Sequence, residues 1–135
     1  MKKYSFLLLV VICLMMTACA AGDAGVNGSW KLISYGSSNS LVPAVPNVDA
    51  VFSFDDGVLS GNSGCNSFRG DYKVNGDQIT FGSVAFTEMG CPSPQMEQES
   101  VVQQVLTGAG SFKIEVNTLT ITNQNMLLVF ESVEE

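Results

Sequence analysis

Carboxylates and cysteines are the side chains here that could do chemistry, because the 135 residues contain no histidine. Without histidine, neither a Ser–His–Asp nor a Cys–His pairing can form, and general-base catalysis loses its usual agent. Asp55 and Asp56 are adjacent, so they would face opposite sides of a strand or lie in solvent at a turn. We therefore assign no catalytic residue, and a hydrolase that uses carboxylates alone stays open as an alternative.

Two motifs come close to ligand-binding loops but lack essential residues. The run 71–77 is close to an EF-hand loop, but Lys73 replaces a calcium ligand and Gly82 stands where the bidentate glutamate belongs. Gly61-x-x-Gly64 lacks the lysine that follows the glycines of a phosphate-binding loop. We expect no metal and no cofactor, and the first motif is better explained as a β-hairpin turn.

Cys65 and Cys91 are the two cysteines left to pair, because Cys13 lies in the signal peptide expected over 1–18 and Cys19 is expected to carry a lipid. The envelope outside the cytoplasm is oxidising, so a disulfide between the two is the default expectation. Closing that loop would stabilise the fold by about 3–4 kcal/mol in the chain-entropy model. A redox-active thiol, a metal-binding pair and two free thiols stay open as alternatives, although C-x-x-C spacing is absent.

The residues around Cys65 form a candidate binding loop, made of Asn62, Asn66, Phe68 and Arg69. Polar side chains at the end of a sheet are where small barrels bind ligands. A structural explanation competes with this one, since Asn66 beside a bridged cysteine could bond the exposed backbone of the loop. Glycines nearby, such as Gly64, would supply positive φ at the turns.

A secretion signal occupies residues 1–18. Lys2 and Lys3 precede the apolar run 6–16, which is shorter than the about 20 residues needed to cross a bilayer as a helix. A basic start followed by a short apolar stretch is typical of a cleaved signal peptide. The chain should therefore be exported.

The end of this signal contains a lipidation motif. Met16-Thr17-Ala18-Cys19 resembles the lipobox of bacterial lipoproteins, whose cysteine carries the lipid. We expect lipidation of Cys19 and a flexible tether over 19–27. A plain signal peptide, cut near Ala18 or Ala21, is the alternative. Because Ala20 is not aspartate, the expected location in a Gram-negative cell is the outer membrane, facing the periplasm.

After the signal, four basic and thirteen acidic residues remain, a net charge of −9. Such a charge repels phosphate backbones and anionic lipid headgroups, so nucleic acid is excluded as a partner. We expect a monomer that contacts the membrane through its lipid. Another protein of the cell envelope is the candidate partner.

Short apolar or alternating runs separated by turn residues predict antiparallel strands. These runs are 30–35, 51–54, 58–60, 68–74, 78–81, 84–87, 111–116, 119–122 and 126–131. Asp55-Asp56-Gly57 and Asn75-Gly76-Asp77 mark hairpin turns. The Pro-containing segment 41–47 is expected to form a loop without regular pairing. The pattern is that of a sheet with one buried face.

One helix is expected over about 94–107, with Ser93 as its N-cap and Gly108 just beyond its end. Apolar residues recur at spacings near three and four: Met96, Val101, Val102, Val105 and Leu106. The polar face would comprise Gln95, Glu97, Gln98, Gln103 and Gln104, with Glu97 and Glu99 near the positive end of the helix. We expect this amphipathic helix to pack on the sheet.

Several of these residues together resemble a known family. The run 61–72 is similar to the G-x-x-G-C-N-x-(F/Y)-x-G-x-Y signature of the META domain, or HslJ-like, family. Thr87-Glu88-Met89-Gly90-Cys91 resembles its T-x-M-A-C segment, with Gly90 in place of alanine. Further matches are Gly28-x-Trp30-x-Leu32, Glu99 with Leu106, Leu119-x-Ile121 and Leu128-x-Phe130.

The resemblance implies an α+β, β-rich domain over 28–135. Its fold would be a strongly curved antiparallel sheet, or a partial barrel of about seven to eight strands, with one packed helix. It further implies a secreted or lipid-anchored, non-enzymatic protein linked to heat shock, stress response or envelope integrity. A protein-binding or inhibitor module that acts through the loop 62–66 stays open beside it.

Overall fold

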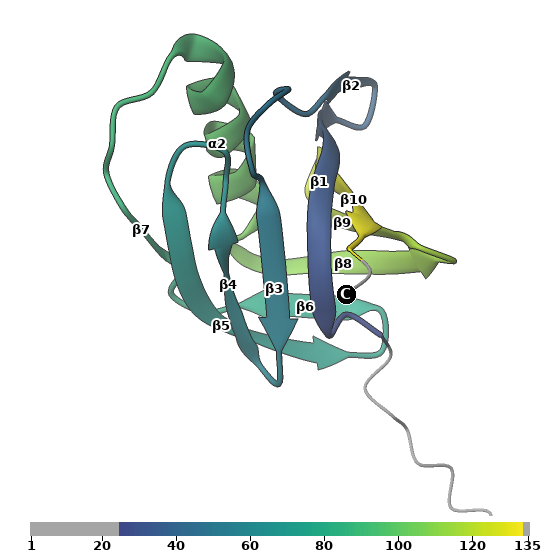
Figure 1. The fold of residues 1–135 in the computed structure, drawn as a ribbon. Helices are drawn as coiled ribbons and strands as arrows, with labels where there is room; N and C mark the ends of the chain where they lie inside the picture. Colours follow the sequence, from purple (N-terminus) through teal and green to yellow (C-terminus); the bar gives the residue numbers. More distant parts are fainter. Residues whose placement is uncertain (1–24, 134–135) are drawn as a thin grey trace, which may run out of the picture.

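Antiparallel pairing connects every strand of the computed structural model, which describes residues 25–133 (Figure 1). The expected signal peptide, Cys19 and most of the expected tether lie outside these residues. The elements are β1 (Gly28–Ser37), β2 (Ser40–Pro43), β3 (Val51–Asp55), β4 (Val58–Asn62), β5 (Ser67–Asn75), β6 (Gln78–Phe81), β7 (Ala85–Phe86), α2 (Ser93–Val105), β8 (Gly108–Glu115), β9 (Thr118–Asn123) and β10 (Met126–Ser132).

Eight of the strands form a closed barrel, in the order β1, β3, β4, β5, β6, β8, β9 and β10. The ring closes because β10 pairs with β1, from Trp30 opposite Ser132 to Ser37 opposite Met126. The two short strands lie beside this ring, since β2 pairs with the end of β1 and β7 with the start of β5. The predicted partial barrel is therefore closed, which removes most of the exposed strand edges.

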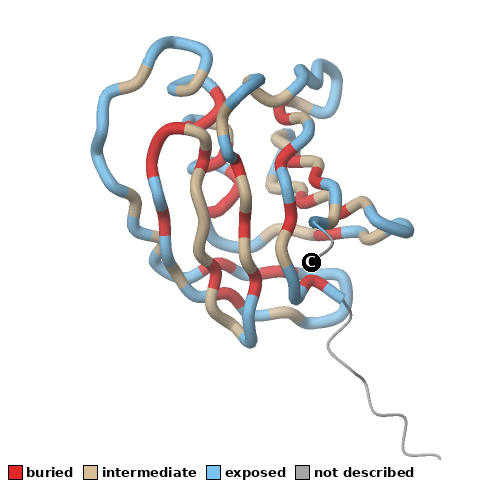
Figure 2. The backbone as a smooth tube through the Cα atoms, viewed as in Figure 1, coloured by how far each residue is buried: buried red, intermediate tan, exposed pale blue. Residues whose placement is uncertain are grey.

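Alternating side chains fill the barrel with aromatic rings. Phe52 on β3 is fully buried, and its ring centroid lies 4.7 Å from that of Phe68 and 4.8 Å from that of Phe130. These contacts reach from β3 across the interior to β5 and β10. Phe54 makes a similar edge contact with Tyr72 at 5.1 Å. Figure 2 shows the result, with buried positions alternating along the strands.

The two predicted hairpin turns are confirmed, and one predicted loop is wrong. Asp55 pairs with Val58, and Asn75 pairs with Gln78. The expected loop 41–47, however, begins with β2, whose residues pair with 34–37 of β1. Proline is tolerated there because Pro43 ends a strand at the edge of the sheet, where no ladder needs its missing N–H.

The predicted helix forms over Ser93–Val105 rather than 94–107. Ser93 is its first residue instead of its cap, and Pro92 at the N-cap makes no side-chain hydrogen bond. The helix packs against β1, β9 and β10, as an amphipathic helix should. Its buried face nevertheless includes Gln98 and Glu99, which the apolar pattern had assigned to solvent and to the helix start.

The folded domain begins before β1. Val26 is 3% exposed, and its carbonyl oxygen accepts a 2.8 Å hydrogen bond from Nε1 of Trp30. The side chain of Asn27 accepts a 2.7 Å bond from the Tyr72 hydroxyl. These two residues, which the sequence placed in a flexible tether, are held by the barrel.

Tyr35 generates a prediction about alkaline pH. Burial raises the pKa of its phenol above 10.0, and the nearby Glu97 raises it further. Because the folded pKa is raised, the contribution of Tyr35 to stability should be complete below pH 10 and lost as pH rises through the folded pKa. An absorbance titration should include a late step that belongs to Tyr35, and Tyr35→Phe should remove that step. Glu97→Gln should shift it only partway back; a Tyr35 that titrates at the ordinary value would contradict the structure.

Candidate functional site

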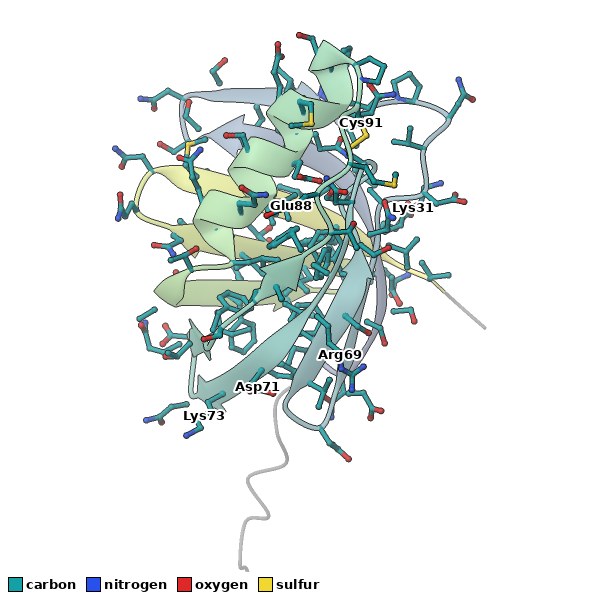
Figure 3. All side chains as sticks on the ribbon, turned by 90° about the vertical axis from the view of Figure 1, so that its left-hand side faces the viewer. Lys31, Arg69, Asp71, Lys73, Glu88 and Cys91 are labelled. Atoms are coloured by element: carbon teal, nitrogen blue, oxygen red, sulfur yellow. A yellow bond between two sulfur atoms is a disulfide. The ribbon has the colours of Figure 1, made fainter. Side chains whose placement is uncertain are left out.

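A disulfide joins Cys65 to Cys91, which confirms the default expectation for the pair. The two Cα atoms are 6.0 Å apart across 26 positions of sequence. Cys65 lies in the loop after β4 and is buried, whereas Cys91 lies just before α2 and is half-buried (Figure 3). The bridge therefore fixes the segment that leads into the helix against the barrel.

Asn66 is the centre of a buried hydrogen-bond network. Its side chain is 1% exposed, and its amide both donates to the Met89 carbonyl oxygen (3.1 Å) and accepts from the Met89 N–H (2.7 Å). The same oxygen accepts from the Thr87 hydroxyl at 2.8 Å. One side-chain amide thus replaces a neighbouring strand for the backbone of Met89.

Glu99 supplies the charge of this network. It is 3% exposed on α2, and Oε2 accepts hydrogen bonds from the Ser63 hydroxyl (2.6 Å) and the Asn66 N–H (2.9 Å). Its Oε1 accepts from the Asn66 amide (2.9 Å) and from Gln103 (3.3 Å). A buried carboxylate is costly unless donors surround it, and here both oxygens are occupied.

Gln98, the residue before Glu99, also links α2 to the loops by hydrogen bonds. It is fully buried, donates to the Ser63 carbonyl oxygen at 2.6 Å and accepts from the Val45 N–H at 2.8 Å. Gly64 has a φ of +96°, and a Cβ there would lie 2.6 Å from Nε2 of Gln98. This close approach explains the second glycine of the G-x-x-G-C-N motif. Two polar residues of α2 therefore hold the helix to two separate loops.

A groove of about 820 Å³ lies between α2 and the segment 82–90. Buried Asn66 and Glu99 belong to its lining, while Met89 and Met96 are 60% and 41% exposed. The other lining residues are Gly82, Ser83, Val84, Phe86, Thr87, Glu88, Gly90, Gln103, Leu106 and Thr107. Figure 3 views this side of the molecule, with Glu88 beside the helix and Cys91 above Glu88, near the upper end of the helix. The lining contains carboxylates and no basic side chain.

The four residues of the predicted binding loop differ in their exposure to solvent and in their distance from the groove. Asn66 and Phe68 are buried, so neither side chain is available to a partner in this structure. Asn62 is half-buried and bonds within its own loop, with Oδ1 accepting from the Gly64 N–H at 2.7 Å. Arg69 is exposed on β5, outside the groove (Figure 3). Of the four, only Asn66 reaches the groove, and it does so as part of the lining.

Sequence reasoning missed the groove and could have found part of it. Ala85 pairs with Arg69 of β5, the Thr87 N–H donates to Ser67 of β5, and the Met89 N–H donates to Asn66. Every second residue of this wall therefore directs its backbone groups toward β5 and the loop that precedes it. The motif T-x-M has that spacing. The opposite wall of the groove is α2, and the local sequence pattern of α2 does not indicate that the helix lies beside the segment 82–90.

Glu88 and Glu99 both line the groove, but the hydrogen bonds of Glu99 leave neither of its oxygens without a donor. Within residues 25–133 no three acidic or cysteine side chains gather as metal ligands would. In the same part of the chain, no helix has the length and apolar character to span a bilayer.

The network predicts a large cost for removing the Asn66 side chain. Asn66→Ala should lower the free energy of unfolding by about 3 kcal/mol, because Glu99 and both polar groups of Met89 lose partners inside the protein. Asn62→Ala is the matched control in the same loop and should cost about 1 kcal/mol. Urea unfolding measures both; equal costs would mean that the network does not hold the groove wall.

Solved structures of similar fold, all under 25% identical to this chain, support the architecture. A protein from Burkholderia xenovorans superimposes with a TM-score of 0.67 at 18% identity, covering 81% of this chain and 83% of that one. A second NMR structure reaches 0.64 at 22% identity, covering 78% and 89%. A lipocalin-like protein from Bacteroides uniformis reaches 0.51 at 18% identity, covering 83% and 100%.

Sequence comparison identifies the family. Heat shock protein HslJ of Escherichia coli (strain K12) is 26% identical over 80 residues, so the match spans 58% of this chain and 57% of that protein. The family model of the META domain matches residues 24–135, which include all of the described barrel and α2. The resemblance seen in the motifs is confirmed, and the chain belongs to the META domain family.

Proposed function

We propose that this protein is a lipid-anchored, non-enzymatic binding module of the bacterial cell envelope, and that the groove beside α2 is its ligand site. The observation that carries this function is a groove whose two walls are both fixed. The wall 82–90 is held by the disulfide and by Asn66, and the helical wall is held by Gln98 and Glu99. A preformed site loses little entropy on binding, which favours affinity.

The interior of the barrel is a weaker candidate for the ligand site. Eight-stranded barrels either fill their interior with side chains or hold one small ligand. Here Phe52, Phe54 and Phe130 are at most 1% exposed and lie among other buried rings. A ligand inside would have to displace these side chains, whereas the groove is open without any rearrangement.

A lipid anchor at Cys19 would leave the α2 side of the groove accessible. Six peptide units separate Cys19 from Gly25, so they span at most about 20 Å. In Figure 1 the described chain starts at the lower end of β1, whereas α2 lies at the upper end of the barrel. The α2 wall of the groove would then lie at the end of the barrel away from the anchored start of the chain.

A non-enzymatic role fits the state of the groove carboxylates. Glu99 could act as a base or nucleophile only if bonds to Ser63, Asn66 or Gln103 were broken first. The name of the relative HslJ, a heat shock protein, supports a role in stress tolerance or envelope integrity. We assign the location to the outer membrane, facing the periplasm, if the source is Gram-negative.

The anchor is tested by metabolic labelling with palmitate. The wild-type chain should incorporate the label, and Cys19→Ser should not, because the thiol that carries the lipid is gone. Cys65→Ser is the matched control and should still be labelled, since Cys65 pairs with Cys91 in the folded domain. Equal labelling of wild type and Cys19→Ser would overturn the anchoring.

The groove is tested by a substitution that fills it. No atom lies within 4 Å of the position that a Cβ on Gly90 would take, so Gly90→Trp should occupy the groove without straining the fold. Under heat or detergent stress, a Gly90→Trp strain should survive no better than a deletion strain. Ser38→Trp, at an exposed turn outside the groove, should behave as wild type. Wild-type survival of Gly90→Trp beside a sensitive deletion strain would remove the groove as the site.

A further inference from the structure

The wall of the groove formed by residues 84–90 has one edge without a strand partner. Within the described part of the chain, β5 is the strand that pairs with β7, and it does so from one side. Phe68 lies opposite Phe86, Arg69 lies opposite Ala85, and the Thr87 N–H donates to the Ser67 carbonyl oxygen at 2.9 Å. The pairing is thus antiparallel and regular up to Thr87.

This register determines which backbone groups face the groove. In an antiparallel ladder, alternate residues direct both N–H and C=O to the same neighbour. Ala85 and Thr87 face β5, and Met89 continues the alternation by bonding to Asn66 through both its N–H and its C=O. Phe86 and Glu88 therefore direct their backbone groups to the opposite edge, where the groove lies.

We propose that this edge binds an extended segment of another polypeptide by strand addition, inside the groove. A strand on this edge would pair with the backbone of Phe86 and Glu88 while α2 covers it from the other side. Beyond β7 itself, Ala85–Phe86, the edge would continue to residue 90; fully extended, 84–90 would span about 20 Å, or six rises of a strand, which matches about seven residues of a partner. Small molecules would use only a fraction of this length.

The lining also indicates which side chains the partner carries. Val84, Phe86 and Met96 offer apolar surface, and the side chains of Met89 and Met96, which are 60% and 41% exposed, can adapt to varied shapes. Because side chains of a strand alternate, every second residue of the partner would contact this surface. Glu88 is exposed and the lining has no basic residue, so a basic side chain opposite Glu88 complements the groove.

Because this partner would occupy the groove assigned above, the inference rests on the proposed function. The probe is a pool of random peptides of about seven residues. Peptides that bind the purified wild-type protein are kept, and those that also bind the Gly90→Trp variant are removed. The selected peptides should carry alternating apolar residues and a basic residue. On binding, hydrogen exchange should slow at the amides of Phe86 and Glu88, whereas the Thr87 amide, already bonded to β5, should change little.

N-methylation separates strand addition from other kinds of groove binding. In a bound strand, alternate peptide nitrogens face β7, so methylating that set should weaken binding by about tenfold or more. Methylating the other set should change the affinity by less than about twofold. Glu88→Gln should weaken the basic peptides selectively, with Gln104→Ala, outside the groove lining, as the unaffected control.

Two results would overturn the inference, and each can be told apart from failure of the proposed function. Peptides that bind in the groove but tolerate both methylation patterns equally would exclude strand addition and leave the groove as a binding site. A pool with no member retained better by wild type than by Gly90→Trp would exclude a polypeptide partner. The survival of the Gly90→Trp strain under stress then decides separately whether the groove functions at all.

Discussion

Burying the carboxylate of Glu99 constrains the rest of this structure, because a charge removed from water must be surrounded by donors. Those donors come from Ser63, Asn66 and Gln103. To supply them, the loop after β4 must turn toward the helix, and Asn66 must leave solvent. Asn66 then presents its remaining amide groups to Met89, which fixes the segment before α2. One buried charge therefore organises a loop, a helix and one wall of the groove.

The barrel and the groove consequently have different physical origins. The barrel is stabilised by apolar burial and by the pairing of β1 with β10, and its aromatic interior is complete without the helix network. The groove lies outside this interior and is shaped by hydrogen bonds and a disulfide. A fully satisfied polar network of this kind makes the segments that it joins rigid. Rigid walls over an accessible, partly apolar floor are what a binding module requires.

The limits of sequence prediction follow the same division. Hairpins at Asp56-Gly57 and Gly76-Asp77 were predictable because turn chemistry is local. The closure of the barrel was not, since it depends on the meeting of β1 and β10 from opposite ends of the chain. The apolar pattern of α2 correctly located Val102 and Val105 in the core, but it assigned Gln98 and Glu99 to solvent or the helix start. Their partners lie more than thirty positions away, so no local pattern could reveal them. For the same reason Asn66 was a candidate ligand-binding residue until its partners were known.

The Asn66 network should make the segment 82–90 a rigid wall of the groove. Native-state hydrogen exchange tests this directly at two neighbouring amides. Met89 is 60% exposed, yet its N–H donates to Asn66, whereas the alternation that starts in β7 places the Glu88 N–H at the open edge. The Met89 amide should exchange only through large-scale unfolding, with protection close to that of the barrel strands, while Glu88 should exchange rapidly. A Met89 amide that exchanges as fast as that of Glu88 would show that the Asn66 network does not make this wall rigid.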